Sequence, residues 1–316
     1  MKKKPIIVFL TGGLGNQLFQ LANAILLDPE REVLLEWTLG KPRCNPDGLP
    51  DIQSFCLPDR VQIMPVARYS RLASKTAGYL LRSGIAPKWW EKKRLSQKTT
   101  LLLGSVVLSI HFRRFIRILR GTGIGYSRII PREVTEIIIG YFQSSRFTKD
   151  AHVYQELRKL ELTKEDVRIE GFRKLAVLEE PIVVHFRFGD YKLEDSFGIP
   201  RPEYYEKALE EMTHKYPHSK IWVFTDEAEA AERVFPTNHA SNARWFTDKS
   251  ITSAETLEIM RLGKSYIIAN STFSWWGAIL SNSENPMVIC PDVWFKSQAE
   301  PLDLIPSNWK RVPAWQ

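Results

Sequence analysis

Short apolar runs, rich in Ile and Val, alternate along this chain with longer stretches of mixed polarity. The runs predict strands buried on both faces, and the mixed stretches between them predict helices. The predicted strands are Ile6–Leu10, Val33–Trp37, Val134–Phe142, Ile182–Val184, Ile221–Phe224 and Ser265–Ala269. The predicted helices are Leu18–Ile25, Arg201–Tyr216, Glu227–Val234, Ser253–Leu262, a charged stretch over residues 147–180 and a segment after Ser274. This alternation favours an α/β fold built on parallel sheets.

The length of the chain favours two domains. A single hydrophobic core stops growing beyond about 250–300 residues, and this chain has 316. We expect a first domain over residues 1–165 and a second over residues 166–316, closely packed because no low-complexity linker separates them. Lys41–Asp59, rich in Pro, Asp and Gly, is expected to be a loop. The region Val61–Arg120 is helix-prone in pieces.

The segment Pro181–Tyr191 changes character where its apolar run ends. His185, Arg187 and Asp190 follow closely, with Gly189 just before the aspartate. Open α/β sheets bind ligands at the carboxyl ends of their strands. A guanidinium makes paired, charge-assisted hydrogen bonds to phosphate, so Arg187 is a candidate phosphate ligand. The alternative is an ordinary strand end with a surface ion pair between Arg187 and Asp190.

Two later strand ends also carry polar groups. Ile221–Phe224 leads into Thr225 and Asp226, and Ser265–Ala269 leads into the hydroxyl-rich segment Asn270–Ala278. Each alone is explained by helix capping, because Asp, Ser and Thr are common N-caps. Parallel strands bring their carboxyl ends together, however, so the three strand ends predict one shared site for an anionic ligand.

The first predicted strand runs into a glycine-rich turn, Thr11–Gln20. A strand, a glycine-rich turn and a helix form the layout in which backbone N–H groups face a ligand. The G-x-G-x-x-G spacing of dinucleotide sites is absent, since Leu18 occupies the third glycine position, and no P-loop lysine follows. Asn16 and Gln17 add two amide side chains to this turn.

Basic residues concentrate in the first half of the chain. Residues 1–150 contain 24 Lys and Arg against 11 Asp and Glu, whereas the remainder contains 20 against 25. Between Arg60 and Arg132, Glu91 is the only acid among 16 basic residues. This basic block indicates an anionic partner, either lipid or nucleic acid. The alternative is a basic face that is simply solvated. No nucleic-acid-binding motif accompanies it, so nucleic acid is the least favoured partner.

Part of this block, His111–Arg120, alternates basic and apolar residues at partly helical spacing. We interpret it as an amphipathic helix, either with an ordinary solvated basic face or lying on a membrane surface.

No apolar run in the chain reaches the roughly 18 residues that a spanning helix needs. Cys44, Cys56 and Cys290 are few, odd in number and without metal-ligand spacing, which fits a reducing compartment. We therefore expect a cytoplasmic protein that associates peripherally with the inner face of the membrane.

Five motifs together resemble those of the α-1,2-fucosyltransferases of glycosyltransferase family 11, in the same order. They are GGLGNQLFQ (Gly12–Gln20), YFQS (Tyr141–Ser144), HFRFGDY (His185–Tyr191), FTDE (Phe224–Glu227) and NSTFSWWGA (Asn270–Ala278). The resemblance covers most of the chain and is weakest between residues 40 and 135. It implies a GT-B-like architecture, in which two Rossmann-like domains face each other across a cleft. The first domain would then hold the acceptor, and the second the nucleotide sugar.

The resemblance also implies an activity. The enzyme would move L-fucose from GDP-fucose, with inversion, to the 2-hydroxyl of an acceptor sugar, often galactose, in surface polysaccharide synthesis. The acceptor would be an oligosaccharide or a lipid-linked glycan. No cofactor and no metal would be required, and the chain has no acidic D-x-D cluster. In such a site an arginine, rather than a divalent cation, stabilises the charge on the leaving diphosphate.

By the same resemblance, Arg187, Asp190 and Asn16 are the catalytic candidates, with Arg187 on the pyrophosphate. His185 is expected at the guanine end, and Asp226 on the guanine ring. The complete set of donor-binding candidates is His185, Arg187, Thr225, Asp226, Ser271, Thr272, Phe273 and Ser274. The acceptor side is expected to contain Gly13, Gly15, Asn16 and Gln17. The base that takes the acceptor proton stays open among Asp190, Glu194 and Asp195, and a dissociative reaction needs little help from a base.

One position departs from the family pattern. The motif commonly carries two adjacent arginines, and the second is Phe188 here. Lys192 or an arginine of the basic block is a candidate replacement. A related GDP-hexose is an alternative donor, and a non-catalytic nucleotide-sugar binder is an alternative function.

Overall fold

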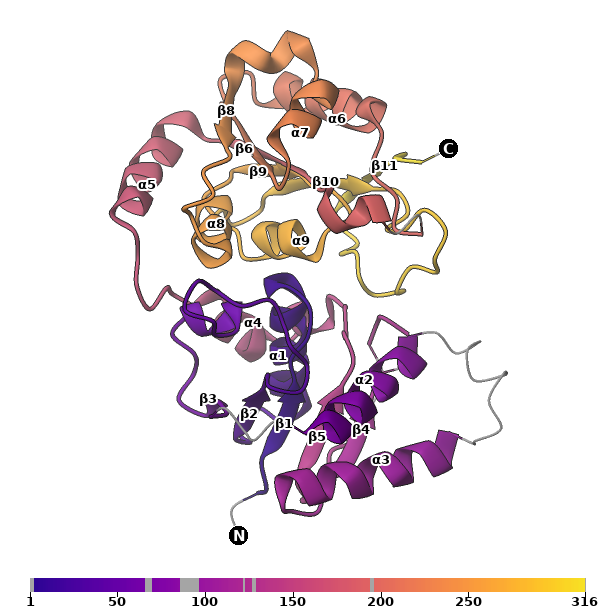
Figure 1. The fold of residues 1–316 in the computed structure, drawn as a ribbon. Helices are drawn as coiled ribbons and strands as arrows, with labels where there is room; N and C mark the ends of the chain where they lie inside the picture. Colours follow the sequence, from indigo (N-terminus) through magenta and orange to yellow (C-terminus); the bar gives the residue numbers. More distant parts are fainter. Residues whose placement is uncertain are drawn as a thin grey trace. The chain divides into compact units, whose positions relative to one another are not determined.

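The computed structural model describes residues 3–65, 70–85, 97–121, 123–126, 129–193 and 196–315, and the chain divides into two compact units (Figure 1). Unit 1 comprises Met1–Thr163 with Pro301–Ile305, and unit 2 comprises Lys164–Glu300 with Pro306–Gln316. The division after Thr163 lies beside the boundary expected at residue 165. The short segment Pro301–Ile305, which the sequence analysis places in the second domain, belongs to unit 1. The backbone N–H and the hydroxyl of Ser145 both donate to the Asp303 carbonyl, at 2.6 and 2.8 Å.

Within the described residues, unit 1 is built on a five-stranded sheet with the order β3-β2-β1-β5-β4. Its strands are β1 (Ile6–Phe9), β2 (Val33–Glu36), β3 (Val61–Ile63), β4 (Arg117–Arg120) and β5 (Glu136–Ile139). All neighbouring pairs run parallel. The strand order reverses between β1 and β5, so the carboxyl ends of these two strands form the switch point at which parallel α/β sheets bind ligands.

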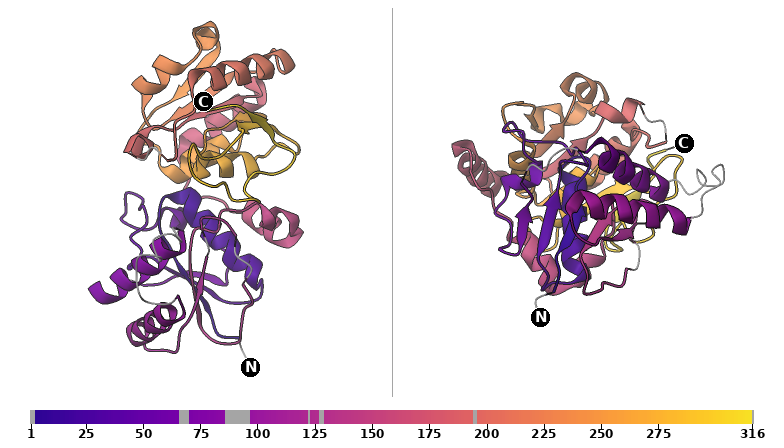
Figure 2. Two further views of the ribbon diagram at one scale, coloured as in Figure 1. Left: turned by 90° about the vertical axis from the view of Figure 1, so that its right-hand side faces the viewer. Right: turned by 60° about the horizontal axis from the view of Figure 1, so that its bottom comes forward.

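Helices cover both faces of this sheet. They are α1 (Leu14–Leu27), α2 (Arg71–Ile85), α3 (Gln97–Phe112) and α4 (Ala151–Arg158), with the 3-10 turns η1 (Asp51–Ser54) and η3 (Arg146–Lys149). Ile7 and Phe9 of β1 pack with residues of α2 and α3, which lie together in both views of Figure 2. Ile6 and Val8 point to the opposite face, because successive strand residues alternate, and both are fully buried.

The basic block contains two strands that the sequence analysis missed, β3 and β4. The predicted amphipathic helix over His111–Arg120 is wrong: α3 ends at Phe112, and Arg117–Arg120 pairs in parallel with β5. The two bases Arg117 and Arg120 are therefore the ends of an edge strand, and the apolar residues between them, Ile118 and Leu119, lie on opposite faces of the sheet. Arg117 also pairs with Glu136 at 2.5 Å, and Leu119 is buried on the sheet.

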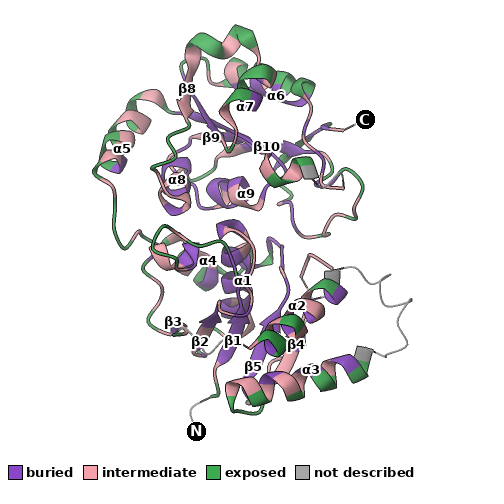
Figure 3. Cartoon of the chain, in the orientation of Figure 1, coloured by how far each residue is buried: buried purple, intermediate pink, exposed green. Residues whose placement is uncertain are grey.

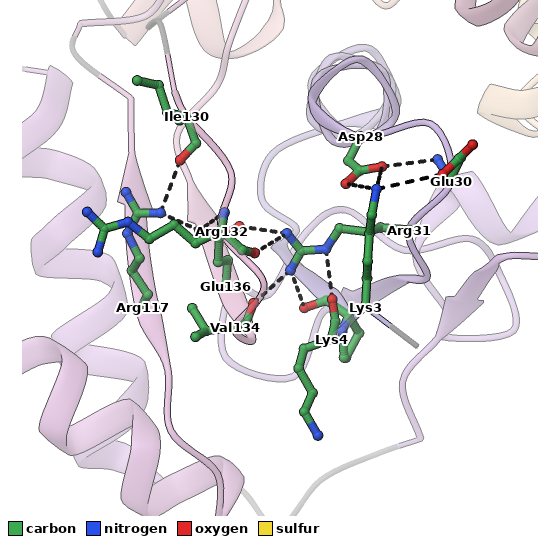
Figure 4. Close-up of polar contacts among 11 residues, drawn as sticks. Lys3, Lys4, Asp28, Glu30, Arg31, Arg117, Ile130, Arg132, Val134 and Glu136 are labelled. Atoms are coloured by element: carbon green, nitrogen blue, oxygen red, sulfur yellow. Dashed lines mark hydrogen bonds and ion pairs between the residues drawn. The ribbon is translucent and has the colours of Figure 1, made fainter. Parts of the chain in front are cut away.

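A buried ion pair closes the amino end of this sheet (Figure 4). Arg31 is 1% exposed, and its Nη1 donates to Glu136 Oε2 at 2.8 Å. The remaining Arg31 donors reach the backbone carbonyls of Lys4, Pro5, Arg132 and Val134. Such a buried charge is tolerated because its donors are satisfied. The network ties β5, the segment before β1 and the turn before β2 together, away from the switch point.

Within the described residues, unit 2 is built on a six-stranded sheet with the order β11-β10-β9-β6-β7-β8. Its strands are β6 (Ile182–Phe186), β7 (Ile221–Thr225), β8 (Ala243–Phe246), β9 (Ser265–Ile267), β10 (Met287–Pro291) and β11 (Lys310–Val312). All neighbours run parallel. Numbered from β6, this is the 3-2-1-4-5-6 order of the Rossmann fold, with its switch point between β6 and β9.

The helices of unit 2 are α5 (Val167–Glu179), α6 (Pro202–Lys215), α7 (Ala228–Val234), α8 (Ser253–Met260) and α9 (Thr272–Ile279), with the 3-10 turns η4 (Gly189–Leu193) and η5 (Thr237–Asn242). The predicted α/β class, with two domains on parallel sheets, is confirmed. Strands β8, β10 and β11 were not predicted from the sequence. None of the helices in the described ranges is long and apolar enough to cross a membrane.

Candidate functional site

The carboxyl end of β6 holds Arg187 between two acids. Its Nη2 lies 2.5 Å from Asp190 Oδ1, and its Nη1 lies 3.0 Å from Asp226 Oδ2. The guanidinium also sits 5.6 Å from the ring centre of Tyr191. The ion pair with Asp190, which we considered as an ordinary surface pair, is therefore present but belongs to a larger cluster. The Arg187 side chain is 16% exposed, so it is held in place and still reachable from solvent.

Asp226 connects the ends of β6 and β7. One of its oxygens accepts the Phe188 backbone N–H at 3.0 Å, while the other faces Arg187. Gly189 leaves the room for this contact, because a Cβ at that position would come within 2.5 Å of Asp226 Oδ2. Thr225, the preceding residue, accepts the Glu227 N–H through its hydroxyl at 3.1 Å. Asp226 was expected to contact a guanine ring. In the structure, both of its carboxylate oxygens already contact groups of the protein.

His185 has a buried imidazole ring, and one ring nitrogen is available for a hydrogen bond. It is 5% exposed, and its Nδ1 has no hydrogen-bond partner among the described residues. Its ring lies 6.1 Å from that of Phe273 in α9. Burial, with a smaller contribution from the charge of Arg187, lowers the pKa of His185 to about 3. The imidazole is therefore neutral at pH 7, and its open nitrogen is suited to one hydrogen bond with a ligand.

The start of α9 lies at the end of β9, on the other side of the switch point from Arg187. Ser271 is the N-cap, and its hydroxyl accepts the Phe273 N–H at 3.3 Å. Ser274 is fully buried, and its hydroxyl donates to the Ser271 carbonyl. These two hydroxyls stabilise the helix start, as the capping alternative predicts. Thr272 is the first helical residue and is partly exposed. The positive end of a helix dipole favours an anion at this point.

Tyr191 and Asn270 join the two strand ends, although neither was predicted from the sequence as a site residue. The Tyr191 hydroxyl donates to the Asn270 carbonyl at 2.9 Å. Asn270 is fully buried, and its amide donates to the Phe197 carbonyl, while its Oδ1 has no partner within the described ranges. The signal was available: Asn270 is the first polar residue after an apolar strand, and both residues lie in the motifs.

Phe188 is a core residue. It is 6% exposed and stacks on Phe186, with ring centres 6.3 Å apart. The Lys192 ammonium lies 5.8 Å from the Phe188 ring and is paired with Glu227. The site of the family's second arginine is thus filled by the hydrophobic core, with a paired lysine beside it. Glu194 and Asp195, considered as bases, lie outside the described residues.

In unit 1, two motifs meet at the switch point between β1 and β5. Gln143 Nε2 donates to Asn16 Oδ1 at 3.1 Å, and the Gln143 Oε1 is buried without a partner in the described part of the chain. Phe142, just before it, has a φ of +53°, a left-handed conformation that a bulky residue rarely adopts. Gly140 makes this possible, since a Cβ there would come within 2.8 Å of the Phe142 ring. Strained backbone of this kind clusters at functional sites.

The glycine-rich turn is held from within by Gln17. Its amide donates to the carbonyls of Gly12 and Arg43, and its oxygen accepts the Ile52 N–H at 3.0 Å. Gln17 is fully buried, so it supports the turn rather than lining its surface. Gly13 is the N-cap of α1, with Gly15 buried in the first turn. Asn16 is the partly exposed amide of the predicted pair.

Two buried carboxyl groups near this end of the sheet were also missed. Glu36 ends β2 and is 1% exposed. Burial raises its pKa to about 7, although hydrogen bonds from the Leu39 N–H act in the opposite direction. Asp51 in η1 is 3% exposed; burial raises its pKa, and the charge of Arg43 opposes this. The sequence pattern could have indicated Glu36, because it is an acid at the end of an apolar strand. No comparable pattern marks Asp51, which lies in a loop.

A cavity of about 310 Å³ opens beside β1 in unit 1. Its lining includes Thr11 from the turn, Lys41 from the loop after β2, and Lys75 and Arg82 from α2. Three bases and no acid line this cavity, so its chemistry suits an anionic or polyhydroxylated ligand. Across the described residues, no group of three or more His, Cys, Asp and Glu side chains is placed to hold a metal ion.

One family model matches more than half of this chain. The model of Glycosyl transferase family 11 matches residues 117–311, which include every motif above except Gly12–Gln20. An α-1,2-colitosyltransferase of Escherichia coli is 21% identical over an alignment of 328 residues, covering 97% of this chain and 98% of that protein. The O-antigen biosynthesis glycosyltransferase WbnK of Escherichia coli is 34% identical over 119 residues, or 35% of this chain and 38% of that protein. The crystal structure of fucosyltransferase NodZ from Bradyrhizobium is 14% identical, with a TM-score of 0.47 over 89% of this chain and 94% of that one.

Proposed function

Because this chain belongs to glycosyl transferase family 11, we propose that it is an inverting transferase that moves L-fucose from GDP-fucose to the 2-hydroxyl of an acceptor sugar. One observation carries the proposal: Arg187, His185 and the start of α9 converge at the switch point of a Rossmann-ordered sheet. A cation, an imidazole whose Nδ1 has no partner among the described residues, and a helix start are the groups that suit a nucleoside diphosphate.

In the proposed reaction the acceptor oxygen attacks the anomeric carbon of the donor sugar. The bond from that carbon to the β-phosphate oxygen breaks, and its electron pair leaves with GDP. Arg187 and the first N–H groups of α9 stabilise this growing charge from fixed positions. Asp190, whose carboxylate is 61% exposed beside Arg187, is our proposed acceptor for the hydroxyl proton.

We assign the acceptor to unit 1. The Asn16–Gln143 pair offers amide groups for sugar hydroxyls, and the basic cavity beside β1 suits a phosphate. A lipid-linked glycan is an acceptor that carries both sugar hydroxyls and phosphate, because it joins a sugar to a diphosphate. We place the reaction in the cytoplasm, where thiols such as Cys44 and Cys56 stay reduced.

A second candidate donor is GDP-colitose. It is favoured by the relative named as an α-1,2-colitosyltransferase, which aligns over nearly the whole of this chain. The loss of the second arginine at Phe188 also separates this site from the common fucosyltransferase pattern. The reaction and the phosphate-binding groups are the same for both donors, so only the sugar differs.

The test is a donor screen with the purified full-length protein. GDP-fucose, GDP-colitose, GDP-mannose and UDP-galactose are incubated with and without galactose-terminated acceptors, and nucleotide release and product linkage are followed. We expect acceptor-stimulated GDP release from GDP-fucose and an α-1,2 linkage in the product. Preference for GDP-colitose would select the second donor. Raised melting temperature with a GDP-sugar but no turnover would indicate a binder, and release of UDP alone would refute the proposal.

We also propose that the transfer needs no metal, since Arg187 and a helix start can stabilise the diphosphate. Activity should therefore survive treatment with EDTA. Activity that disappears in the chelator and returns on addition of Mn²⁺ would contradict this.

A further inference from the structure

Helix α3 carries apolar side chains on the face that it turns to solvent. Leu102, Leu103, Val106 and Ile110 are 66%, 54%, 51% and 73% exposed. Figure 3 shows exposed positions at several places along α3. The spacing of the four side chains, by three and four residues, places them along one side of a helix. We call these four residues the α3 stripe. Phe115, just beyond the helix, extends the apolar surface and is 72% exposed.

The opposite face of α3 is already occupied by its own unit. Leu108 is fully buried in the core with Leu80 of α2. A Cβ on Gly104 would come within 3.0 Å of Leu80, which shows how closely the two helices pack. Ser109 accepts the Ile116 N–H at 2.9 Å and fixes the turn into β4. The helix is therefore docked on one side, and the stripe is an additional apolar surface rather than the packing face.

Basic residues stand at both ends of the stripe. Lys98 lies in the first turn of the helix, and Arg113 and Arg114 follow its last turn; all three are exposed. No acid occurs in the described parts of residues 60–132, and none of these three side chains has an acidic partner within salt-bridge distance among the described residues. Arg114 shares the lining of a cavity with Glu32 and Glu133, so Lys98 and Arg113 are the less compensated charges.

This combination favours one occupant over the others. Exposed aliphatic side chains flanked by cations are the pattern of helices that lie in the interface of an anionic bilayer. A second copy of the chain on this face would bring bases against bases in either orientation of two α3 helices, which like charges disfavour. An ordinary solvent-facing helix would have polar residues at the stripe positions.

We propose that the outer face of α3 is the membrane-contact surface of this protein. The α3 stripe and Phe115 enter the interfacial layer of an anionic bilayer, while Lys98, Arg113 and Arg114 contact lipid phosphates. The helix has 16 residues and lies along the surface rather than across it. The contact differs from a purely electrostatic attachment of the basic block, because apolar insertion persists in part when salt screens the charges. It does not depend on which sugar the enzyme transfers.

The test is cosedimentation of the full-length protein with vesicles of phosphatidylcholine and phosphatidylglycerol in equal parts, compared with phosphatidylcholine alone. We expect binding to the anionic vesicles and little binding to the neutral ones. The double variant Leu103→Ser, Val106→Ser should lower the bound fraction about tenfold, since two inserted side chains are lost. The double variant Arg113→Gln, Arg114→Gln should reduce the preference for anionic lipid.

The matched control is Val177→Ser, Leu178→Ser on α5, where both side chains are also exposed, at 80% and 79%. It should bind vesicles like the wild type, and the melting temperatures of all variants should be unchanged. Equal sedimentation of the wild type with both vesicle types would overturn the proposal, as would equal losses in the α3 and α5 variants. A wild-type dimer that the α3 variant alone abolishes, without vesicle binding, would identify the stripe as a self-association surface and also overturn it.

Discussion

The guanidinium of Arg187 lies 3.0 Å from the carboxylate of Asp226, so the cation at the end of β6 is oriented by the residue that follows the neighbouring strand β7. The other oxygen of Asp226 accepts the Phe188 N–H, which fixes the backbone that follows Arg187. A long side chain loses conformational freedom when it binds a ligand, and an ion pair that holds it beforehand lowers this loss. Asp226 thus positions Arg187 within unit 2.

Replacement of Arg187 by alanine should abolish most of the transfer while leaving the fold intact. We expect a loss of about 3–4 kcal/mol in transition-state stabilisation, or roughly a hundredfold to a thousandfold in rate, as for removal of one preorganised donor. Steady-state transfer kinetics of the purified variant provide the measurement. Arg173→Ala is the control, because Arg173 also pairs with acids but lies on the surface of α5. Activity of the Arg187 variant within threefold of wild type would refute the role.

Replacement of Gly189 by alanine should impair the site without touching Arg187. The new Cβ would meet Asp226 Oδ2 at 2.5 Å and displace the carboxylate from both of its partners. We expect transfer to fall about tenfold or more, because misplacement near an active site is costly. Gly171→Ala in α5 is the matched control: nothing lies within 4 Å of its Cβ, and the helix should gain about 0.5–1 kcal/mol. Equal activity of the two variants would contradict this role for Asp226.

Restoring the family's second arginine, by Phe188→Arg, should destabilise the protein rather than improve it. Phe188 is packed in the core against Phe186, and an arginine there would bury an unpaired charge. We expect a loss of about 3 kcal/mol or more in the free energy of unfolding. Phe188→Leu, which keeps the position apolar, should cost less. Urea titration of both variants measures this, and an arginine variant as stable as the leucine variant would show that the position can open to solvent.

Glu36 should make the stability of unit 1 fall as pH rises. Its folded pKa of about 7 exceeds the ordinary value of 4.5, so the native state binds more protons than the unfolded state between these values. The contribution of Glu36 to the free energy of unfolding is therefore fully present below pH 4.5 and is lost as pH rises through 7, by about 3 kcal/mol. Glu36→Gln should consequently be more stable than wild type at pH 8 and similar at pH 5.

Thermal unfolding across this pH range measures the difference. Glu30→Gln serves as the control, because it removes an acid whose side chain is 83% exposed rather than buried. If the wild type and Glu36→Gln differ by the same amount at pH 5 and pH 8, the carboxyl group does not titrate as the burial implies.

The sequence by itself determined the class of fold and the strand ends that carry the site. Strands such as Ile182–Phe186 can be predicted from local apolar runs, and the polar residues of the site follow these runs directly in the chain. Because parallel strands align their carboxyl ends, these local patterns are enough to predict that Arg187 and Ser271 lie at one edge of one sheet. The motifs then indicated the family.

Only the tertiary structure decided which of these groups are free and which support others. Asn16 meets Gln143, and Arg31 meets Glu136, across more than 100 residues of chain, and no local period encodes such pairs. The edge strand β4 was missed because its register is set by β5, not by its own sequence. Likewise, α3 is apolar on both faces, so periodicity cannot say which face is buried. That choice was made by the close packing of Gly104 on α2, which leaves the α3 stripe turned to solvent.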